Sequence, residues 1–473
     1  MTHIPILRAG KPYKSLDAAQ IRHVETGEIY AEASQANPGL IARDMLKAPD
    51  RKRAMERIPI AEMLDICKRA ARVFMEDALP IGNETQTPDD YVRQTSASTG
   101  LPQTLCRLNM EKIRHNLDKM ETILGGLTRG LNLRIIENGW GVQDGRRLSY
   151  APQTDALGAV LPSNSPGVHS LWLPAVALRV PVVLKPGSGD PWTPYRIAQA
   201  LMKAGCPAEA FSFYPSSHNG ANEILVRTGS SMLFGGADTV RPWRNDPRVQ
   251  IHGPGWSKVL FGEDAADGWR AHLDMLEYSV ADNGGRSCVN ASGVWTPSRA
   301  REMAEALAKR LAQIEAKPLD DPDARIAAFA NPRAAQAVSD MIDAGLKTGG
   351  AVDLTAQFRK GRRFVQIGNC GYVQPTVVYC ESFDHPLAKM ELLLPFVSVV
   401  QVPQAEMLTR IGPTLSAAVV TEDAEWMREL MSAPHIERLS FGSIPTNRVA
   451  WDQPHEGNLF ERLYRQRAFQ ASA

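Results

Sequence analysis

The feature that most constrains this fold is an alternation of short apolar strands with helices between residues 157 and 234. Alternation at this spacing is typical of a parallel sheet covered by helices on both faces. The predicted strands are residues 157–161, 181–184, 210–214 and 231–234. The predicted helices between them are residues 168–178, 194–204 and 222–227. We therefore expect an α/β fold.

A second run of alternating elements follows Gly255. It holds predicted helices at residues 298–316 and 332–346, joined by a polar linker at 317–323, and strands at 372–379 and 396–402. The chain has 473 residues, more than one hydrophobic core usually supports. We expect two α/β domains, both with parallel-type sheets.

Two further regions frame these runs. Residues 51–77 and 105–124 place apolar side chains at intervals of three and four, which predicts helices. Residues 131–151 are interpreted as a projecting β-hairpin, with strands at 132–136 and 147–150 around a turn containing Gly and Asp. A lone hairpin is barely stable in water, so it is expected to pair with a second subunit in a homodimer or homotetramer.

The charge balance excludes some partners. The net charge is +1, without the positive excess that grips nucleic acid or anionic lipid, so neither nucleic acid nor a membrane is an expected partner. Residues 1–10 lack a signal-peptide pattern, and the longest apolar stretch, 169–184, is too short to span a bilayer. Six scattered cysteines without a C-x-x-C pair predict a cytoplasmic protein with no metal site.

The first candidate for chemistry is Cys288, which ends the segment Asn-Gly-Gly-Arg-Ser-Cys at residues 283–288. Two glycines let the backbone turn tightly and bring the sulfur and its amide close to a ligand. A cysteine can attack a carbonyl carbon, and its backbone N–H can bind the resulting oxyanion. The alternative is a buried cysteine that acts as a small apolar residue.

Asn164 follows a predicted strand, within Leu-Pro-Ser-Asn-Ser-Pro at residues 161–166. Ligands of parallel α/β sheets bind beyond the carboxyl ends of the strands. An Asn side chain at this place can donate a hydrogen bond to a developing oxyanion. The alternative is an Asn that only favours a turn between two prolines.

Two charged residues are candidates for binding a nucleotide. Lys185 leaves an apolar strand in Val-Val-Leu-Lys-Pro-Gly-Ser at residues 182–188, where an ammonium can hold a ribose or a phosphate. Glu391, in Lys-Met-Glu-Leu-Leu-Leu-Pro-Phe at residues 389–396, can accept hydrogen bonds from a ribose diol. The alternative for both is a solvated surface side chain.

Taken together, the four segments resemble the aldehyde dehydrogenase superfamily over residues 50–465. Asn164 falls at the family's P-W-N-F-P motif and Lys185 at its V-x-K-P-S/A-E motif. Cys288 falls in its N-x-G-Q-x-C segment and Glu391 in its E-I-F-G-P segment. The resemblance implies an NAD(P)-dependent oxidoreductase acting on a small-molecule aldehyde or acyl-CoA, with Cys288 as nucleophile and Asn164 as oxyanion donor.

The resemblance also divides the chain. Residues 1–130 and 152–255 are expected to form a dinucleotide-binding domain, and residues 256–449 a catalytic cysteine domain. Residues 131–151, with the tail 450–473, are expected to serve oligomerisation. Within the tail, residues 452–460 do not match the usual family end, and His455 or Glu456 is expected to reach a substrate tunnel.

Binding of NAD or NADP is assigned by the resemblance to Pro162, Ser163, Lys185, Gly187, Ser188, Phe234, Gly236, Ala237, Gly253 and Glu391. A standard G-x-G-x-x-G fingerprint is missing, and the family's F-T-G-S-x-x-x-G turn here has Arg241 at its second glycine. Ser188 stands where the family has a glutamate that faces the adenosine ribose. Losing that carboxylate removes repulsion of a 2′-phosphate, so both dinucleotides stay open.

His252 stands where hydrolytic members have the glutamate that activates water. Its segment, Ile-His-Gly-Pro-Gly-Trp-Ser-Lys at residues 251–258, resembles the G-x-G-P-G-N turn of CoA-acylating aldehyde dehydrogenases and fatty acyl-CoA reductases. Without a base for water, a thioester on Cys288 persists until the thiol of CoA takes the acyl group. The resemblance therefore favours interconversion of an aldehyde and an acyl-CoA.

Two alternatives stay open at this point. An imidazole titrates near neutral pH and is itself a general base, so His252 is also compatible with a hydrolytic enzyme that releases a carboxylic acid. A histidine that only fills the turn is the structural explanation of the same residue. A member that keeps the fold as a non-catalytic scaffold is the alternative of another class, because fold alone does not imply function.

Overall fold

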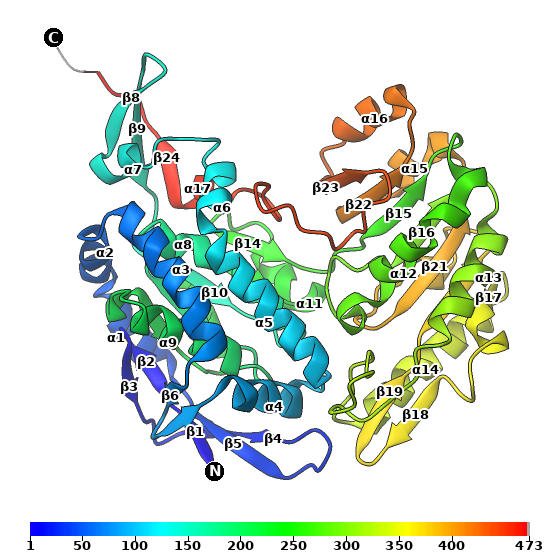
Figure 1. The fold of residues 1–473 in the computed structure, drawn as a ribbon, viewed down its shortest axis with the longest axis horizontal. Coiled ribbons are helices and arrows are strands. Elements are labelled where there is room, and N and C mark those ends of the chain that lie inside the picture. The colour runs from blue at the N-terminus through cyan, green and yellow to red at the C-terminus, as the bar shows by residue number, and fades with distance from the viewer. Residues whose placement is uncertain (471–473) are drawn as a thin grey trace.

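The computed structural model describes residues 1–470 and shows two domains, each built on a seven-stranded sheet (Figure 1). Residues 471–473, the end of the predicted tail, lie outside the described residues. The predicted α/β fold with two parallel-type sheets is confirmed. Within residues 1–470, no helix combines the length and the apolar character needed to cross a bilayer.

The first sheet has the strand order β14-β13-β10-β11-β12-β2-β3. In that order its strands are Val249–His252, Ser230–Phe234, Leu157–Val160, Val182–Lys185, Phe211–Phe213, Ile6–Arg8 and Lys11–Tyr13. The five strands β14 to β12 are parallel, and β2 and β3 continue the sheet antiparallel. Both faces of β11 are buried, because Val182 and Leu184 enter one core and Val183 the other. The run Val-Val-Leu is apolar throughout for this reason.

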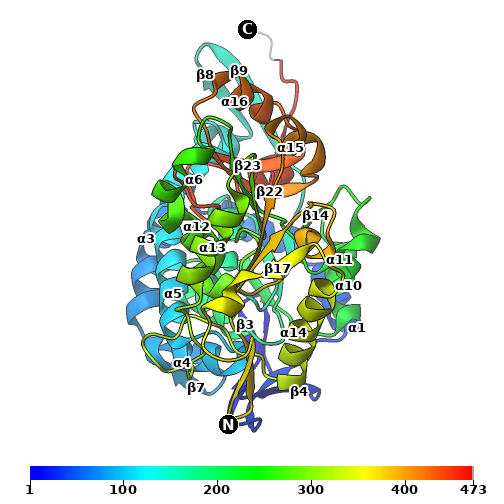
Figure 2. The same cartoon turned by 90° about the vertical axis from the view of Figure 1, so that its right-hand side faces the viewer.

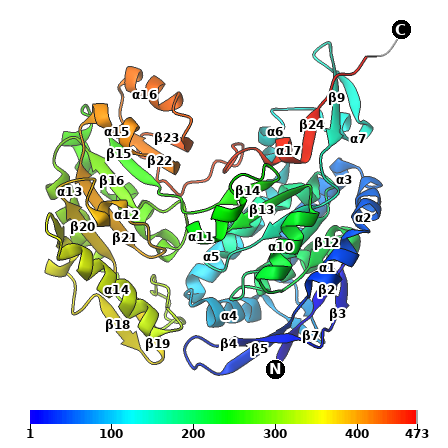
Figure 3. The same cartoon turned by 180° about the vertical axis from the view of Figure 1, so that it is seen from behind.

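Helices cover both faces of this sheet. Figure 1 shows α3 and α5 in front of it, and Figure 3 shows α1 and α10 on the opposite face. The helix α3 is strongly amphipathic, with Ile60, Met63, Cys67 and Phe74 on its buried face. The helices of this domain are α1 (Pro38–Met45), α2 (Ala48–Glu56), α3 (Ile60–Glu76), α4 (Pro88–Thr99), α5 (Gln103–Asp118), α6 (Met120–Leu127), α8 (Leu173–Ala177), α9 (Trp192–Lys203), α10 (His218–Arg227) and α11 (Ala237–Val240).

The second sheet has the strand order β17-β20-β21-β16-β15-β22-β23 and is parallel except for β17. In that order its strands are Ala351–Asp353, Thr376–Cys380, Phe396–Gln401, Gly293–Thr296, Lys258–Phe261, Thr414–Val420 and Ile436–Phe441. Figure 2 shows α12 and α13 on one side of it and α14 on the other. The helices are α12 (Leu273–Ala281), α13 (Ala300–Leu311), α14 (Pro332–Leu346), α15 (Gln404–Arg410) and α16 (Ala424–Met431).

Smaller sheets complete the fold. The N-terminal sheet has the order β1-β5-β4, and two hairpins add β6 with β7 and β18 with β19. Their bounds are β1 (Thr2–Ile4), β4 (Ala18–Arg22), β5 (Ile29–Ser34), β6 (Leu79–Ile81), β7 (Glu84–Gln86), β18 (Phe364–Ile367) and β19 (Cys370–Val373).

The projecting hairpin exists, but its first strand was predicted at the wrong place. It is formed by β8 (Trp140–Gln143) and β9 (Arg146–Pro152), whereas residues 132–136 lie largely in the helix α7 (Arg134–Asn138). A stretch of five residues with three apolar side chains fits a helix or a strand equally well by periodicity. The missed signal is Gly139, which ends α7 in the left-handed conformation at φ 75°. After α17 (Leu459–Leu463), the C-terminal strand β24 (Tyr464–Gln466) pairs with β9.

Two predicted helices are shorter than expected. Residues 168–178 are split into a 3-10 helix, η1 (Pro166–Leu171), and α8, because Pro174 is accepted only in the first turn of a helix. The helix predicted at 298–316 is α13, which ends at Leu311. After Leu311 the chain is no longer helical, but Ile314 is still buried in the core. The apolar spacing therefore continues beyond the end of the helix, which made the predicted helix too long.

Candidate active site

A cavity of about 600 Å³ lies where the two domains meet, and it brings three predicted catalytic residues together. Cys288, Asn164 and His252 all line it. Asn164 follows β10, His252 ends β14, and Cys288 follows the 3-10 helix η5 (Asp282–Gly285). The segment between β23 and α17 crosses from the second domain to the first and also lines the cavity (Figure 1).

The loop that carries Cys288 is shaped by consecutive left-handed residues. Asn283, Gly284 and Gly285 have φ values of 54°, 65° and 69°. A Cβ on Gly285 would lie 2.3 Å from the carbonyl carbon of Leu394, so only glycine fits there. Position 255 is equally restricted, because a Cβ on Gly255 would lie 2.1 Å from the Cys288 carbonyl oxygen. The turn that follows His252 therefore packs directly on the backbone of Cys288.

A buried asparagine pair ties the Cys288 loop to the Asn164 loop. The Nδ2 of Asn109 donates to Oδ1 of Asn283 at 2.7 Å, and Gly167 N donates to Oδ1 of Asn109 at 2.9 Å. The Nδ2 of Asn283 donates to Oγ of Ser165 at 3.0 Å. Because these groups are buried and mutually satisfied, they hold the two loops in a fixed relation.

The side chain of Asn164 is directed toward the Cys288 loop. Its Nδ2 donates to the carbonyl oxygen of Arg286 at 2.6 Å. The guanidinium of Arg286 in turn donates to the carbonyl of Thr99 at 2.8 Å, and burial lowers its pKa to about 10. Its acceptor thus lies two positions before the nucleophile in the chain, and an amide N–H donor placed beside the nucleophile's loop has the chemistry needed to bind an oxyanion.

The surroundings of Cys288 favour its thiol over its thiolate. Burial, followed by the carboxylates of Glu456 and Glu391, raises its pKa to about 12. Its own backbone N–H and the guanidinium of Arg438 act in the opposite direction. Since the thiolate is the nucleophile, the thiol needs a proton acceptor when it attacks a carbonyl.

His252 has the contacts of an oriented base. Its Nδ1 is paired with Oε2 of Glu456, and its ring stacks on Phe234 with centroids 4.2 Å apart. Its Nε2 is buried and has no hydrogen-bond partner among residues 1–470. When Nδ1–H donates to the carboxylate, Nε2 of the neutral imidazole carries the lone pair. His455 and Glu456, which the sequence placed near a substrate tunnel, both line the cavity.

The predicted cofactor residues near Lys185 lie at the carboxyl ends of β10 and β11. Lys185 ends β11, its ammonium group has no ionic or hydrogen-bond partner among residues 1–470, and burial lowers its pKa. Pro162 and Ser163 follow β10, and a Cβ on Gly187 would lie 2.2 Å from Oγ of Ser163. Ser188 is exposed. An unpaired ammonium beside two closely packed strand ends fits the hydroxyls or phosphate of a dinucleotide.

The remaining predicted cofactor residues follow the neighbouring strands. Phe234 ends β13, Gly236 caps α11, Ala237 begins it, and Gly253 follows β14. Arg241 is turned to solvent, where it pairs with Asp238 at 3.2 Å. Arg241 stands where the family has a glycine, but its guanidinium does not obstruct the end of β13.

Glu391 is held by backbone amides. Oε1 accepts a hydrogen bond from Gly255 N at 3.0 Å, and Oε2 accepts one from Trp256 N. Burial raises the pKa of this carboxyl, while those N–H groups oppose the shift. A carboxylate has about four lone-pair sites, so the two oxygens retain acceptor capacity for a ribose diol.

Sequence reasoning missed several residues of this site. Asn109 and Asn283 hold the loops, and Arg438 of β23 lines the cavity. Of the residues outside the family motifs, only His455 and Glu456 had been considered, as part of a segment without a family match. Arg438 lies in a strand and Asn109 in a helix, and neither has a motif around it, so no local signal marks them as residues of the site.

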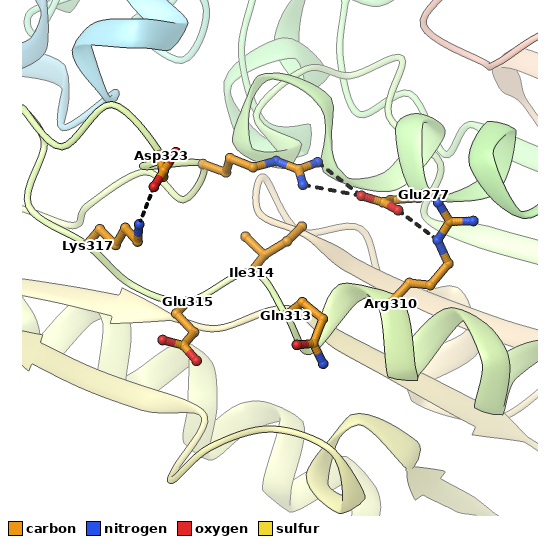
Figure 4. A pocket seen from close by; sticks show the side chains of 8 residues that line it. Glu277, Arg310, Gln313, Ile314, Glu315, Lys317 and Asp323 are labelled. Carbon is orange, nitrogen blue, oxygen red and sulfur yellow. Dashed lines mark hydrogen bonds and ion pairs between the residues drawn. The ribbon is translucent and has the colours of Figure 1, made fainter.

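A second cavity, about 470 Å³ in volume, lies on the second domain away from Cys288 (Figure 4). Its charged side chains neutralise one another. Glu277 pairs with Arg310 at 2.9 Å and with Arg325 at 3.2 Å, and Lys317 pairs with Asp323 at 3.0 Å. Most charged groups of this cavity are thus paired with one another, and its lining includes none of the predicted catalytic residues.

Comparison with known proteins places these features in context. A family model described as "Aldehyde dehydrogenase family" matches residues 14–459. A probable methylmalonate-semialdehyde/malonate-semialdehyde dehydrogenase [acylating] of Aedes aegypti is 23% identical over 301 residues, which are 58% of this chain and 57% of that protein. The 5-carboxymethyl-2-hydroxymuconate semialdehyde dehydrogenase of Escherichia coli is 22% identical over 75% of this chain and 73% of its own length.

Solved structures share the whole architecture. A putative methylmalonate-semialdehyde dehydrogenase from Sinorhizobium meliloti 1021, complexed with NAD, has a TM-score of 0.78 at 16% identity and covers 100% of this chain and 99% of its own. An NADP-dependent glyceraldehyde-3-phosphate dehydrogenase from Bacillus halodurans C-125, complexed with NADP, has a TM-score of 0.77 at 15% identity and covers 99% and 98%. At these identities the likeness concerns the fold.

Proposed function

Because this chain belongs to the aldehyde dehydrogenase family, we propose that it oxidises an aldehyde to a carboxylic acid through an acyl-thioester on Cys288, which water hydrolyses with His252 as base. Family membership supports an NAD(P)-dependent enzyme that acts on aldehydes. The observation that carries the rest is the meeting of Cys288, Asn164 and a Glu456-oriented His252 in one cavity.

In this proposal the first step joins Cys288 to the substrate. The sulfur attacks the carbonyl carbon and the thiol proton passes to Nε2 of His252, which offsets the high pKa of the thiol. The carbonyl oxygen becomes an oxyanion that the Asn164 amide and the Cys288 N–H stabilise. To do so, the Asn164 amide gives up its hydrogen bond to the Arg286 carbonyl and donates to the substrate oxygen instead.

The bound dinucleotide supplies the acceptor for the hydride of the aldehyde carbon. Lys185 and Glu391 are the residues proposed to hold its ribose hydroxyls, with residues 162–163 and 234–237 around the remainder. Nothing in these residues selects NAD over NADP.

The Glu456–His252 pair supports water as the acceptor of the acyl group. Water is a weak acid and needs a base at neutral pH, whereas the thiol of CoA is acidic enough to react with little assistance. An imidazole that is oriented by a carboxylate and retains a free nitrogen is the arrangement found at general bases. After His252 has released the thiol proton to solvent, its Nε2 takes a proton from the water that attacks the thioester. Collapse of the adduct releases the carboxylic acid, and the proton on His252 returns to the sulfur of Cys288.

Transfer to CoA is the second candidate, with acyl-CoA reduction as its reverse. It is supported by the Gly-Pro-Gly turn at residues 253–255, and by curated relatives named as acylating semialdehyde dehydrogenases, although these are only 23% identical over about half of their length. Under this candidate His252 deprotonates the CoA thiol.

The test is oxidation of a panel of aldehydes with NAD⁺ or NADP⁺, with and without CoA, followed by product analysis. Turnover without any thiol, giving the free acid, is the expected result. If turnover requires CoA and yields acyl-CoA, the second candidate replaces the first. If titration with NADH and NADPH changes no fluorescence, the chain is a scaffold and both enzymatic candidates are wrong.

We also propose that the protein is a cytoplasmic homodimer or homotetramer. The three-stranded sheet β24-β9-β8 carries exposed apolar side chains, among them Trp140 at 48% and Val142 at 57% exposure. Burying them against a second copy would stabilise the assembly. All six cysteines are free thiols, as a reducing compartment maintains them. Light scattering of the purified protein tests the oligomeric state.

A further inference from the structure

The cavity around Cys288 contains a guanidinium that no carboxylate of residues 1–470 pairs with. Arg438 of β23 lines the cavity, and its Nη2 donates to the carbonyl of Arg448 at 2.9 Å. Its Nη1 is buried and has no hydrogen-bond partner among residues 1–470. Burying a charge without a partner is costly, so an unpaired guanidinium inside a cavity indicates a ligand of opposite charge.

The other charged groups of the cavity do not neutralise Arg438. The carboxylate of Asp282 pairs with Lys112 at 3.2 Å, and that of Glu456 pairs with His252. Burial, followed by the positive charge of Arg438, lowers the pKa of His455 well below its usual value, so that imidazole supplies no countercharge to Arg438. The carboxylates that line the cavity are thus both engaged elsewhere.

A second arginine continues the positive charge outward. Arg448 lines the same cavity, is exposed, and has no ion pair among residues 1–470. Because the Arg448 carbonyl accepts the hydrogen bond from Arg438, the two side chains are attached to adjoining pieces of backbone. They mark a route from solvent to Cys288 along which an anion is attracted.

We propose that the substrate is an aldehyde with a second, oxyanionic group, a carboxylate or a phosphate, which Arg438 binds while the aldehyde carbon lies at Cys288. This inference rests on the proposed function and names its substrate class. Arg438 is then a specificity residue, and Arg448 assists entry. Guanidinium groups suit both oxyanions because their N–H donors match the oxygens in pairs.

The test compares three aldehydes of equal chain length, ending in a carboxylate, a phosphate or a methyl group. The wild-type enzyme is expected to prefer one anionic aldehyde, and the better of the two identifies the oxyanion. In Arg438→Gln the ratio of kcat/KM for that anionic aldehyde over the neutral one is expected to fall about 10- to 100-fold, the loss of one charge-assisted hydrogen bond. Arg438→Lys keeps the positive charge but not the paired N–H donors of the guanidinium, so its kcat/KM ratio is expected to fall less than that of Arg438→Gln.

Arg72→Gln is the matched control, because Arg72 is 67% exposed on α3 and lies 4.0 Å from its ion partner, Glu76. It removes the same charge far from the cavity and should leave the ratio as in the wild type. An unchanged ratio in Arg438→Gln overturns the proposal. So does an equal loss for all three aldehydes together with slower alkylation of Cys288 by neutral iodoacetamide, which would mean that Arg438 serves the thiolate.

A second measurement uses the wild-type protein and needs no turnover, so it stays informative even when the Arg438 variants fail to fold. In the wild-type protein, a saturated carboxylate or an alkyl phosphate should slow alkylation of Cys288 by iodoacetamide, whereas the alcohol of equal length should not. Absence of protection by both anions overturns the proposal. Protection without any aldehyde oxidation would refute the proposed function and leave the anion site standing.

Discussion

Replacing Glu456 with Gln separates the two things this carboxylate does. Glu456 accepts the hydrogen bond from Nδ1 of His252, and its charge also raises the pKa of Cys288. The amide of Gln can donate to Nδ1, which moves the imidazole proton to Nε2 and removes the lone pair that water requires. We therefore expect slower hydrolysis of the thioester together with a more acidic thiol, which depends less on the Nε2 acceptor in the first step.

The size of each effect follows from the contacts. Loss of a correctly oriented general base slows the step that it serves by about 10²- to 10⁴-fold. The pKa of Cys288 is about 12 against an ordinary 9.0, with burial as the largest cause and Glu456 as the next. Removal of the Glu456 charge therefore lowers this pKa and raises the thiolate fraction at neutral pH, by about tenfold for each unit of pKa. The two readouts thus move in opposite directions.

Rapid-mixing kinetics measure the rate of thioester hydrolysis, and alkylation by iodoacetamide measures the reactivity of the Cys288 thiol. With Glu456→Gln we expect a burst of reduced dinucleotide close to one per active site, followed by a slow steady state, and faster alkylation of Cys288 by iodoacetamide at pH 7. Glu461→Gln is the matched control, because Glu461 lies on α17, is 51% exposed and pairs with Arg129 away from the cavity. An unchanged steady-state rate in Glu456→Gln, or a loss confined to the burst, would refute the assignment of His252.

Three further substitutions test the rest of the site. Asn164→Ala should remove one oxyanion donor and lower kcat by about 10²- to 10³-fold in a protein that still folds; wild-type turnover would contradict the role of the amide. Cys288→Ser should abolish turnover yet still bind NADH or NADPH by fluorescence titration, and retained oxidation would disprove the thioester path. Gly255→Ala places a Cβ 2.1 Å from the Cys288 carbonyl and should destabilise the protein by about 1–3 kcal/mol in denaturant unfolding, so an unchanged midpoint would show that the turn can yield.

Much of the fold could be predicted because its signals are local. The strands β10, β11 and β13 were expected within one residue of their observed bounds, and α14 at its observed ends. Buried parallel strands are short apolar runs, and their alternation with helices is legible in the chain itself. The hairpin failed at residues 132–136, where five residues are too few for periodicity to separate a helix from a strand.

The candidate site was predictable only in part. Cys288, Asn164, Lys185 and Glu391 carry motifs, because glycines, prolines and strand ends around them leave a pattern in neighbouring positions. Whether Glu391 is free or held by backbone amides depends on the turn at residues 253–256, which packs on it from another part of the chain. The pattern of residues around Glu391 does not show whether its carboxylate is hydrogen-bonded.

The amino-acid sequence by itself determined the two parallel sheets, the glycine turn before Cys288 and the family resemblance, since each depends on residues close together in the chain. Only the tertiary structure decided which charges meet. Glu456 reaches His252 across some two hundred positions, and Arg438 enters the Cys288 cavity from the last strand of the second sheet. Electrostatic pairing depends on distance in space and on burial, and neither is written in the spacing of residues along the chain.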